Sequence, residues 1–451
     1  MPSASSLISP KEHYLARAQQ QTDTDLPPWL HNQRKTAALQ LRSLDFPSPR
    51  EEAWKYTNVA TLSKICYELP SVAPLTQEQT ATFRAACFDP QSWNRLVFIN
   101  GHFAPEFSRF ETLPAADGFL GPLKQALQNA DESRRMEPYL GQGITPDEHL
   151  FAALGSALWQ DGFYLRLAPD KVLKNPVHVI HLGSTGSPLL PHPLWVSRHL
   201  ICLERGSKAT VFETYLSLPS ESGLTLACSE VQLDAGANLE HVKLQIEAPQ
   251  TDHISSASAC LGRDSQYQLL TLSAGSHLAR QNLRVRLDAE GANAQIRGLD
   301  LLHGQQHADN HLLIDHAKPN GSSQQFFKGV LADSAHLVFT GRIHVHPDAQ
   351  KTNAYQLNKH LLLSEKAGVD SRPQLEIFAD DVRCTHGAAI GQLDDEMLFY
   401  LKSRGLPENI ARKMLTLGFA HDVLENINDA NMKARLETVL SDQLQKLTHD
   451  R

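Results

Sequence analysis

Cysteine, long apolar runs and excess positive charge are all scarce in this sequence, and each shortage excludes a class of protein. Six cysteines are spread over 451 residues without a CxxC pair, which indicates neither a zinc ribbon nor a compact disulfide framework. The apolar runs are much shorter than the roughly 20 residues of a transmembrane helix. A formal net charge of −8 argues against a broad basic surface for nucleic acid or anionic lipid. Protein or small-ion partners are expected instead.

Signals for targeting and for common catalytic sites are also missing. The amino-terminal segment has no apolar core of a signal peptide, and Glu12 comes too early for an acid-poor transit peptide. A cytoplasmic location is therefore expected. The sequence has no phosphate-binding GxxxxGK loop and no GxSxG elbow of a serine hydrolase. We expect no nucleotide hydrolysis from this chain itself.

Strand patterns dominate from Phe163 onward. Apolar and polar residues alternate over short stretches, for example in VQLDAGANLEHVKLQI, and this alternation is typical of strands with one buried face. Turn residues recur at Gly206, Gly236, Gly262, Gly291, Gly321 and Pro347. A period of about 28 residues favours a stacked β-helix over a sandwich or barrel, whose turns come about every 8 to 12 residues.

Helical patterns flank this region. Apolar residues at three-to-four spacing predict helices between Lys11 and Leu44, with a break at two prolines, and again beyond Gly391. The predicted division is a mainly helical region at 1–155, a β-helix core at 156–392 and a helical region at 393–451.

The first C-terminal helix has a clear start and a strongly apolar stripe. Asp394 is placed to cap the helix, and Gly405 to end it. The stripe is formed by Met397, Leu398, Tyr400 and Leu401. Packing against the last strands explains it most simply, and a surface that binds a partner is the alternative.

Two histidines in GRIHVHPDAQ form a candidate metal site. His344 and His346 project from the same face of a strand, because residues two apart point the same way. A cupin would follow them with a glutamate ligand, and this sequence has none. Without a local third ligand, structural or solvent-facing histidines are favoured. A glycan-cleaving β-helix would need paired carboxylates, and these acids are not paired in sequence: Asp300, Asp309, Asp315 and Asp333.

A cysteine and a histidine in DVRCTHGAAIG form a second candidate. In an extended segment Cys384 and His386 leave the same side of the backbone, and a thiolate beside an imidazole suits iron, zinc or copper(I). Two ligands cannot close a tetrahedral site, so the fold or a second subunit would have to supply the others. The alternative is a buried cysteine beside a turn histidine that bonds the Gly387 backbone.

At these residues the sequence resembles a known family. The stretch SRPQLEIFADDVRCTHGAAIGQLDDEMLFYLKSRGL resembles the SufB/SufD family, the scaffold subunits of the Suf iron–sulfur cluster assembly machinery, and its SufD branch in particular. PSPREEAWKYTNV, VFINGHFAPEFS and FFKGVLADSAHLVFTGRIHVHPDAQKTNAYQLNKHLLLSEKA extend the likeness over nearly the whole chain. The resemblance implies a right-handed parallel β-helix between helical ends, in agreement with the repeat.

The resemblance also implies a role and partners. A non-catalytic scaffold would pair with a SufB-like subunit, or with itself in isolation, and would support iron acquisition. Its C-terminal helices would dock a SufC-like ABC ATPase. His386, with Cys384 as an auxiliary thiol, would face the SufB-like subunit at a transient iron–sulfur cluster, and reduced flavin could join the complex. The contrasting hypothesis is a self-contained metalloenzyme built on His344, His346 and His386.

Overall fold

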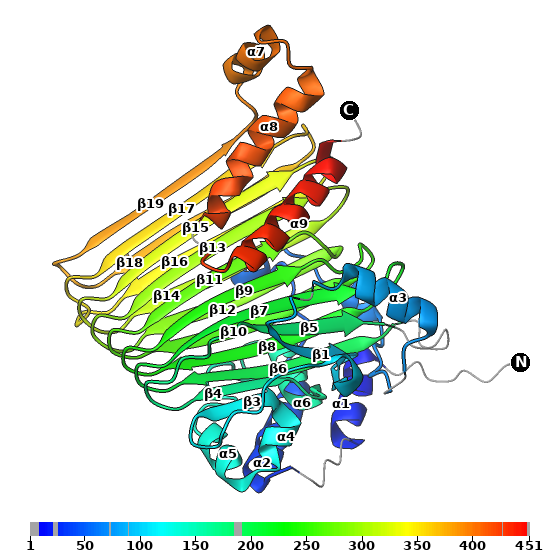
Figure 1. The fold of residues 1–451 in the computed structure, drawn as a ribbon, viewed down its shortest axis with the longest axis vertical. Coiled ribbons are helices and arrows are strands. Elements are labelled where there is room, and N and C mark those ends of the chain that lie inside the picture. Colours follow the sequence, from blue (N-terminus) through cyan, green and yellow to red (C-terminus); the bar gives the residue numbers. More distant parts are fainter. Residues whose placement is uncertain are drawn as a thin grey trace, which may run out of the picture.

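The chain winds into a long parallel β-helix with helices at both ends (Figure 1). This computed structural model describes residues 9–20, 26–71, 74–88, 90–184, 192–425 and 427–448. Residues 1–8, part of the segment expected to lack a targeting signal, lie outside the described residues. None of the helices in the described ranges combines the length and apolar character that a membrane span needs.

Successive strands of the β-helix alternate between two sheets, and all neighbours are parallel except β1 with β2 and β3 with β4. The first sheet contains, in spatial order, β19 (Arg383–Gly391), β17 (Asn353–Leu362), β15 (Ser322–Leu331), β13 (Asn293–Leu302), β11 (Gln266–Ser273), β9 (Asn238–Gln245), β7 (Lys208–Ser217), β5 (Val177–Gly183), β1 (Asn94–Ile99) and β2 (His102–Phe103). The second contains β18 (Gly368–Ile377), β16 (His336–Val345), β14 (His307–His316), β12 (Leu278–Leu287), β10 (Asp252–Leu261), β8 (Leu224–Leu233), β6 (Leu194–Leu203), β4 (Phe163–Leu167) and β3 (Gly118–Pro122).

The register of neighbouring strands reproduces the repeat seen in the sequence. Val285 pairs with Ile314, which pairs with Ile343 one turn further on. All three are fully buried, so identical positions of successive turns stack into the interior. Gly206 and Gly236 take φ values of +69° and +68° at the turns between strands, a conformation that glycine adopts without steric cost. The predicted parallel β-helix is confirmed, with about 7 turns.

Most N-terminal helices cover the outer face of the second sheet at its first turns, whereas α3 and η3 pack against β1, β5 and β7 of the first sheet. Apolar side chains of α6 pack there against β6 and β8, and α2 packs on α6. The helices of this part are α1 (Pro10–Gln20), α2 (Pro28–Ser43), η1 (Glu52–Trp54), η2 (Leu62–Lys64), α3 (Gln77–Ala86), η3 (Pro105–Phe107), α4 (Leu123–Leu127), α5 (Ala130–Met136) and α6 (Leu150–Leu158). The break between the first two coincides with the predicted proline pair.

The C-terminal helices cover the first sheet instead. They are α7 (Asp395–Ser403), α8 (Glu408–His421), η4 (Asp422–Leu424) and α9 (Ala430–Thr448). Helices α8 and α9 lie across the outer face of β13 and β15, and α7 reaches beyond the last turn (Figure 1). The Asp394 side chain accepts hydrogen bonds from the backbone N–H groups of Glu396 and Met397, as predicted for the helix cap.

Candidate functional site

The predicted cluster ligands lie at the open end of the β-helix. Strand β19 pairs with β17 on one edge, and β18 pairs with β16 on one edge. Within the described residues no strand pairs with the other edge of either one. Such edges present unpaired backbone N–H and C=O groups that another chain can extend. The last turn of the β-helix therefore offers a template for a partner.

Cys384 and His386 face inward on this last turn. Their register partners on β17 are Ala354 and Gln356, which are both fully buried in the interior. Since register partners share a face of the sheet, Cys384 and His386 project over the same interior. Cys384 is half-buried against the interior core, while His386 is exposed because no described residue stacks on it.

The two side chains differ in readiness to bind a metal. Partial burial raises the pKa of the Cys384 thiol, although a hydrogen bond with the Ala354 backbone acts in the opposite direction. Among the described residues, no hydrogen bond or ion pair engages the His386 imidazole. An unengaged imidazole beside a protonated thiol is half of a tetrahedral site. His386 is thus the better placed ligand of the isolated chain.

Polar side chains form the floor beneath these ligands, which the sequence analysis missed. Gln356 donates to the Gln325 side chain at 3.0 Å, and Asn358 and His360 continue the same inward row on β17. Within the described residues, both ring nitrogens of His360 and the Asn358 amide nitrogen lack hydrogen-bond partners. Burial lowers the pKa of His360 to about 4, so its imidazole is neutral. Three consecutive inward positions of AYQLNKH are polar, and this pattern was the available signal, although earlier turns also place polar residues such as Lys243 and Asp300 inward.

The predicted docking residues divide between two surfaces of α7. Leu398 is buried and Leu401 half-buried, whereas Met397 and Tyr400 are 57% and 55% exposed. Phe399, which the sequence analysis did not select, is 73% exposed. The main contacts of α7 are with α8 rather than with the last strands. The exposed side of α8 continues this surface through Ile410, Met414 and Leu417.

The structure does not unite the three histidines of the metalloenzyme hypothesis. His344 lies on the outer face of β16 in the second sheet, whereas His386 faces inward from the first. In the described part of the chain, His386 belongs to no group of three potential metal ligands. His344 and His346 instead meet Asp315, one turn back.

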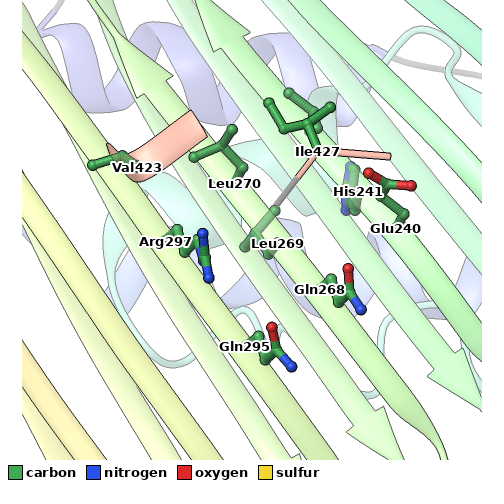
Figure 2. A pocket seen from close by; sticks show the side chains of 10 residues that line it. Glu240, His241, Gln268, Leu269, Leu270, Gln295, Arg297, Val423 and Ile427 are labelled. Atoms are coloured by element: carbon green, nitrogen blue, oxygen red, sulfur yellow. The ribbon is translucent and has the colours of Figure 1, made fainter. Parts of the chain in front are cut away.

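A small cavity lies between the first sheet and the C-terminal segment (Figure 2). Its volume of about 30 Å³ has room for a single water. Val423 and Ile427 cover it, and the Glu240 carboxylate on its rim accepts hydrogen bonds from Asn428. The cavity is a small packing gap between the sheet and the C-terminal segment, and it is far too small for an iron–sulfur cluster.

Comparisons with known proteins agree with the architecture. Residues 189–419 match the SUF system FeS cluster assembly SufBD core domain, and residues 11–179 match the SufBD protein N-terminal region. An iron–sulfur cluster assembly SufBD family protein of Synechocystis is 32% identical over 91% of this chain and 90% of its own length.

Two further relatives are similar over most of their length. The iron–sulfur cluster assembly protein SufD of Escherichia coli is 29% identical, covering 88% of this chain and 89% of its own. The chloroplastic protein ABCI7 of Arabidopsis thaliana is 27% identical over 89% and 83% of the two chains. With both domain matches and the β-helix in place, the chain belongs to the SufBD family of iron–sulfur cluster assembly proteins.

Proposed function

We propose that this chain is a non-catalytic scaffold that completes its cluster site by pairing with a SufB-like subunit. The observation that carries the proposal is the inward-facing pair Cys384 and His386 on an edge strand that no described residue covers. The partner supplies the remaining ligands, including a thiolate, and the transient iron–sulfur cluster forms between the two chains. A small number of ligands suits a scaffold that must release its cluster. Permanently bound iron–sulfur clusters are held by about four protein ligands.

Strand addition at the open end would bring the partner into place. The free edges of β18 and β19 allow a homologous β-helix to continue both sheets through backbone hydrogen bonds. In such a complex, water, cluster sulfide or groups of the partner would provide hydrogen-bond partners for the unsatisfied nitrogens of Asn358 and His360. A second copy of this chain is the alternative occupant in the absence of the SufB-like subunit.

An ABC ATPase of the SufC type is the proposed second partner, and its docking surface is the exposed side of α7 and α8. A continuous group of large apolar side chains that are between about one-third and three-quarters exposed marks an interaction surface. The ATPase supplies the hydrolysis for which this sequence has no motif. Closure of two ATPase subunits would strain the scaffold interface and open the cluster site, which requires an interface with two states.

The assembled complex would work in the cytoplasm and support iron acquisition, and reduced flavin would act at the level of the complex. Neither role needs a cofactor held by this chain alone. The residues to test are therefore those at the proposed interfaces of this chain with the SufB-like subunit and with the ATPase.

Substitution of His386 tests the cluster site. We expect His386→Ala, co-expressed with the SufB-like subunit and the ATPase, to assemble normally but to carry less iron and acid-labile sulfide, and Cys384→Ser to have a smaller effect. The matched control is Thr385→Ala, because Thr385 lies on the same strand but faces outward. Size-exclusion chromatography measures assembly, and iron and sulfide analysis measures the cluster. An unchanged cluster content in His386→Ala would remove this histidine from the mechanism.

Substitution of exposed α7 residues tests ATPase docking more cleanly than truncation does. Deleting residues after Gly391 would uncover the apolar face of the first sheet that α8 and α9 protect. Met397→Ala and Phe399→Ala leave that face covered, and each should weaken binding by about 2 kcal/mol, or roughly 30-fold in Kd, if it removes an interface hot spot. Val172→Ala, at a residue 58% exposed and away from α7, is the control. Equal Kd values in a titration with the ATPase would move docking elsewhere.

A further inference from the structure

Three metal-ligating side chains converge on the outer face of the second sheet. Asp315 on β14 and His344 on β16 are register partners, and His346 follows at the end of the same strand. His344 Nδ1 lies 3.2 Å from Asp315 Oδ1, and His346 Nε2 lies 2.8 Å from the same oxygen. The local sequence around the two histidines contains no third ligand because that ligand comes from the preceding turn, 29 residues earlier.

The spacing suits a metal ion without rearrangement of the backbone. One ligand atom from each residue lies within 4.8 Å of the other two. A tetrahedral ion with bonds of about 2.0 to 2.2 Å holds its ligand atoms about 3.3 Å apart. Small side-chain rotations therefore suffice to place an ion between the three atoms.

Neighbouring residues orient these ligands. Arg286 Nη1 donates to Asp315 Oδ2 at 2.6 Å, which fixes the carboxylate and directs Oδ1 toward both imidazoles. The Phe378 ring packs edge-on against His344 at 5.5 Å between centroids. Supporting contacts of this kind hold metal ligands in place in known sites.

A further carboxylate lies on the next strand, outside this group of three ligands. Glu376 on β18 is the register partner of His344, and the ion pair that its carboxylate forms within the described ranges is with Arg342, at 3.6 Å. Both side chains of that pair are 43% exposed, so the contact is weak and easily exchanged.

An ion-pair network is the competing explanation, and it fits less well. Arg286 already neutralises Asp315, yet two imidazoles direct nitrogens at one carboxylate oxygen. A carboxylate has room elsewhere for such donors. Convergence of three ligand atoms on one point is what a cation requires.

We propose that Asp315, His344 and His346 bind a divalent first-row transition metal, Zn²⁺ or Fe²⁺. Two imidazoles and one carboxylate with open positions are a ligand set of such ions. His344 and His346 are about one-third exposed, so an ion can enter from solvent. The site faces away from the interior toward which Cys384 and His386 point. The proposal of metal binding here is therefore independent of the proposed cluster site.

Cobalt titration of the tag-free full chain, after treatment with chelator, tests the proposal. Co²⁺ replaces either ion at such sites, and its visible absorption reports four- or five-coordinate binding. We expect one equivalent to bind, and Zn²⁺ to displace it. Asp315→Asn and His344→Ala should each raise Kd for Co²⁺ at least tenfold.

Two controls locate the binding. His277→Ala removes a histidine that likewise contacts a carboxylate, that of Asp252 at 3.2 Å, and it should bind Co²⁺ like the wild type. His386→Ala should also bind normally, which separates this site from the cluster site. Anomalous diffraction from zinc-soaked wild-type crystals needs no substitution and should place the ion between the three side chains. Absence of stoichiometric binding, or unchanged affinity in Asp315→Asn and His344→Ala, would overturn the proposal.

Discussion

Lys328 joins the C-terminal helices to the β-helix, and its removal should loosen only that connection. The side chain lies on the outer face of β15, buried beneath the end of α8. Its Nζ donates to the Phe419 carbonyl at 2.6 Å and to Asp422 Oδ2 at 2.7 Å, and it lies 4.3 Å from the centroid of the Phe419 ring. Lys328→Met keeps a long apolar chain in this position but removes the charge and both hydrogen bonds.

The size of the effect follows from these contacts. A hydrogen bond to a charged group contributes about 1.5 to 3 kcal/mol, and the cation–π contact adds about 0.5 to 2 kcal/mol. The ion pair with Asp422 counts for less, because that side chain is 41% exposed. Burying the Lys328 ammonium group costs desolvation free energy, and the methionine variant does not bear this cost, so the net loss is smaller again. We expect a net loss of about 2 to 3 kcal/mol in the free energy of local opening, or about 30- to 150-fold faster exchange.

Hydrogen–deuterium exchange with mass spectrometry measures this opening directly. Peptides from residues 408–425 should exchange faster in Lys328→Met, while interior strands keep their protection. Lys359→Met is the control, since Lys359 is the register partner of Lys328 on β17 but is exposed. Unchanged exchange in 408–425 would refute the anchoring role, and a uniform increase over the whole chain would show a global loss of stability instead.

Two further predictions concern the interior. Burial raises the pKa of Asp300 to about 7, so the folded state keeps a proton that the unfolded chain releases above pH 4. The free energy of unfolding should therefore fall by about 3 kcal/mol from pH 4 to pH 7, and Asp300→Asn should remove this dependence in denaturant titrations at pH 5 and 8. A pH dependence equal in both proteins would be the contrary result. A methyl group on Gly298 would overlap the Phe327 ring, whereas one on Gly391 meets nothing within 4 Å. Gly298→Ala should therefore cost about 1 to 3 kcal/mol in the same assay and Gly391→Ala almost nothing; similar losses would contradict the packing argument.

The β-helix was predictable because each turn repeats the same local rule. Alternating apolar residues define the inward face, and turn residues such as Gly206 and Gly236 recur at a nearly constant interval. The same rule put Cys384 and His386 on one face, because a strand has a period of two. The local sequence was sufficient to predict features, such as strand faces and turns, that depend only on neighbouring residues along the chain.

Features that depend on register between turns could not be predicted. Neighbouring turns differ in length: Asp315 pairs with His344 29 residues later, whereas His344 pairs with Glu376 32 residues later. An error of one residue reverses the face on which a side chain lies, so the sequence could not bring Asp315 to the two histidines. The surroundings of α7 were missed for a related reason, since helical spacing shows an apolar stripe but not which neighbour covers it.

The open end follows from a general property of a parallel β-helix. Every turn but the last is covered by the next, so the final turn exposes inward-facing side chains together with two free strand edges. Polar residues on β17, directly beneath the last strand of the first sheet, such as Gln356 and His360, are costly in an isolated chain because buried polar atoms without partners are destabilising. A fully apolar last turn would avoid that cost but would offer no ligands. The polar floor beneath His386 is therefore better explained by a partner that completes it than by the stability of this chain alone.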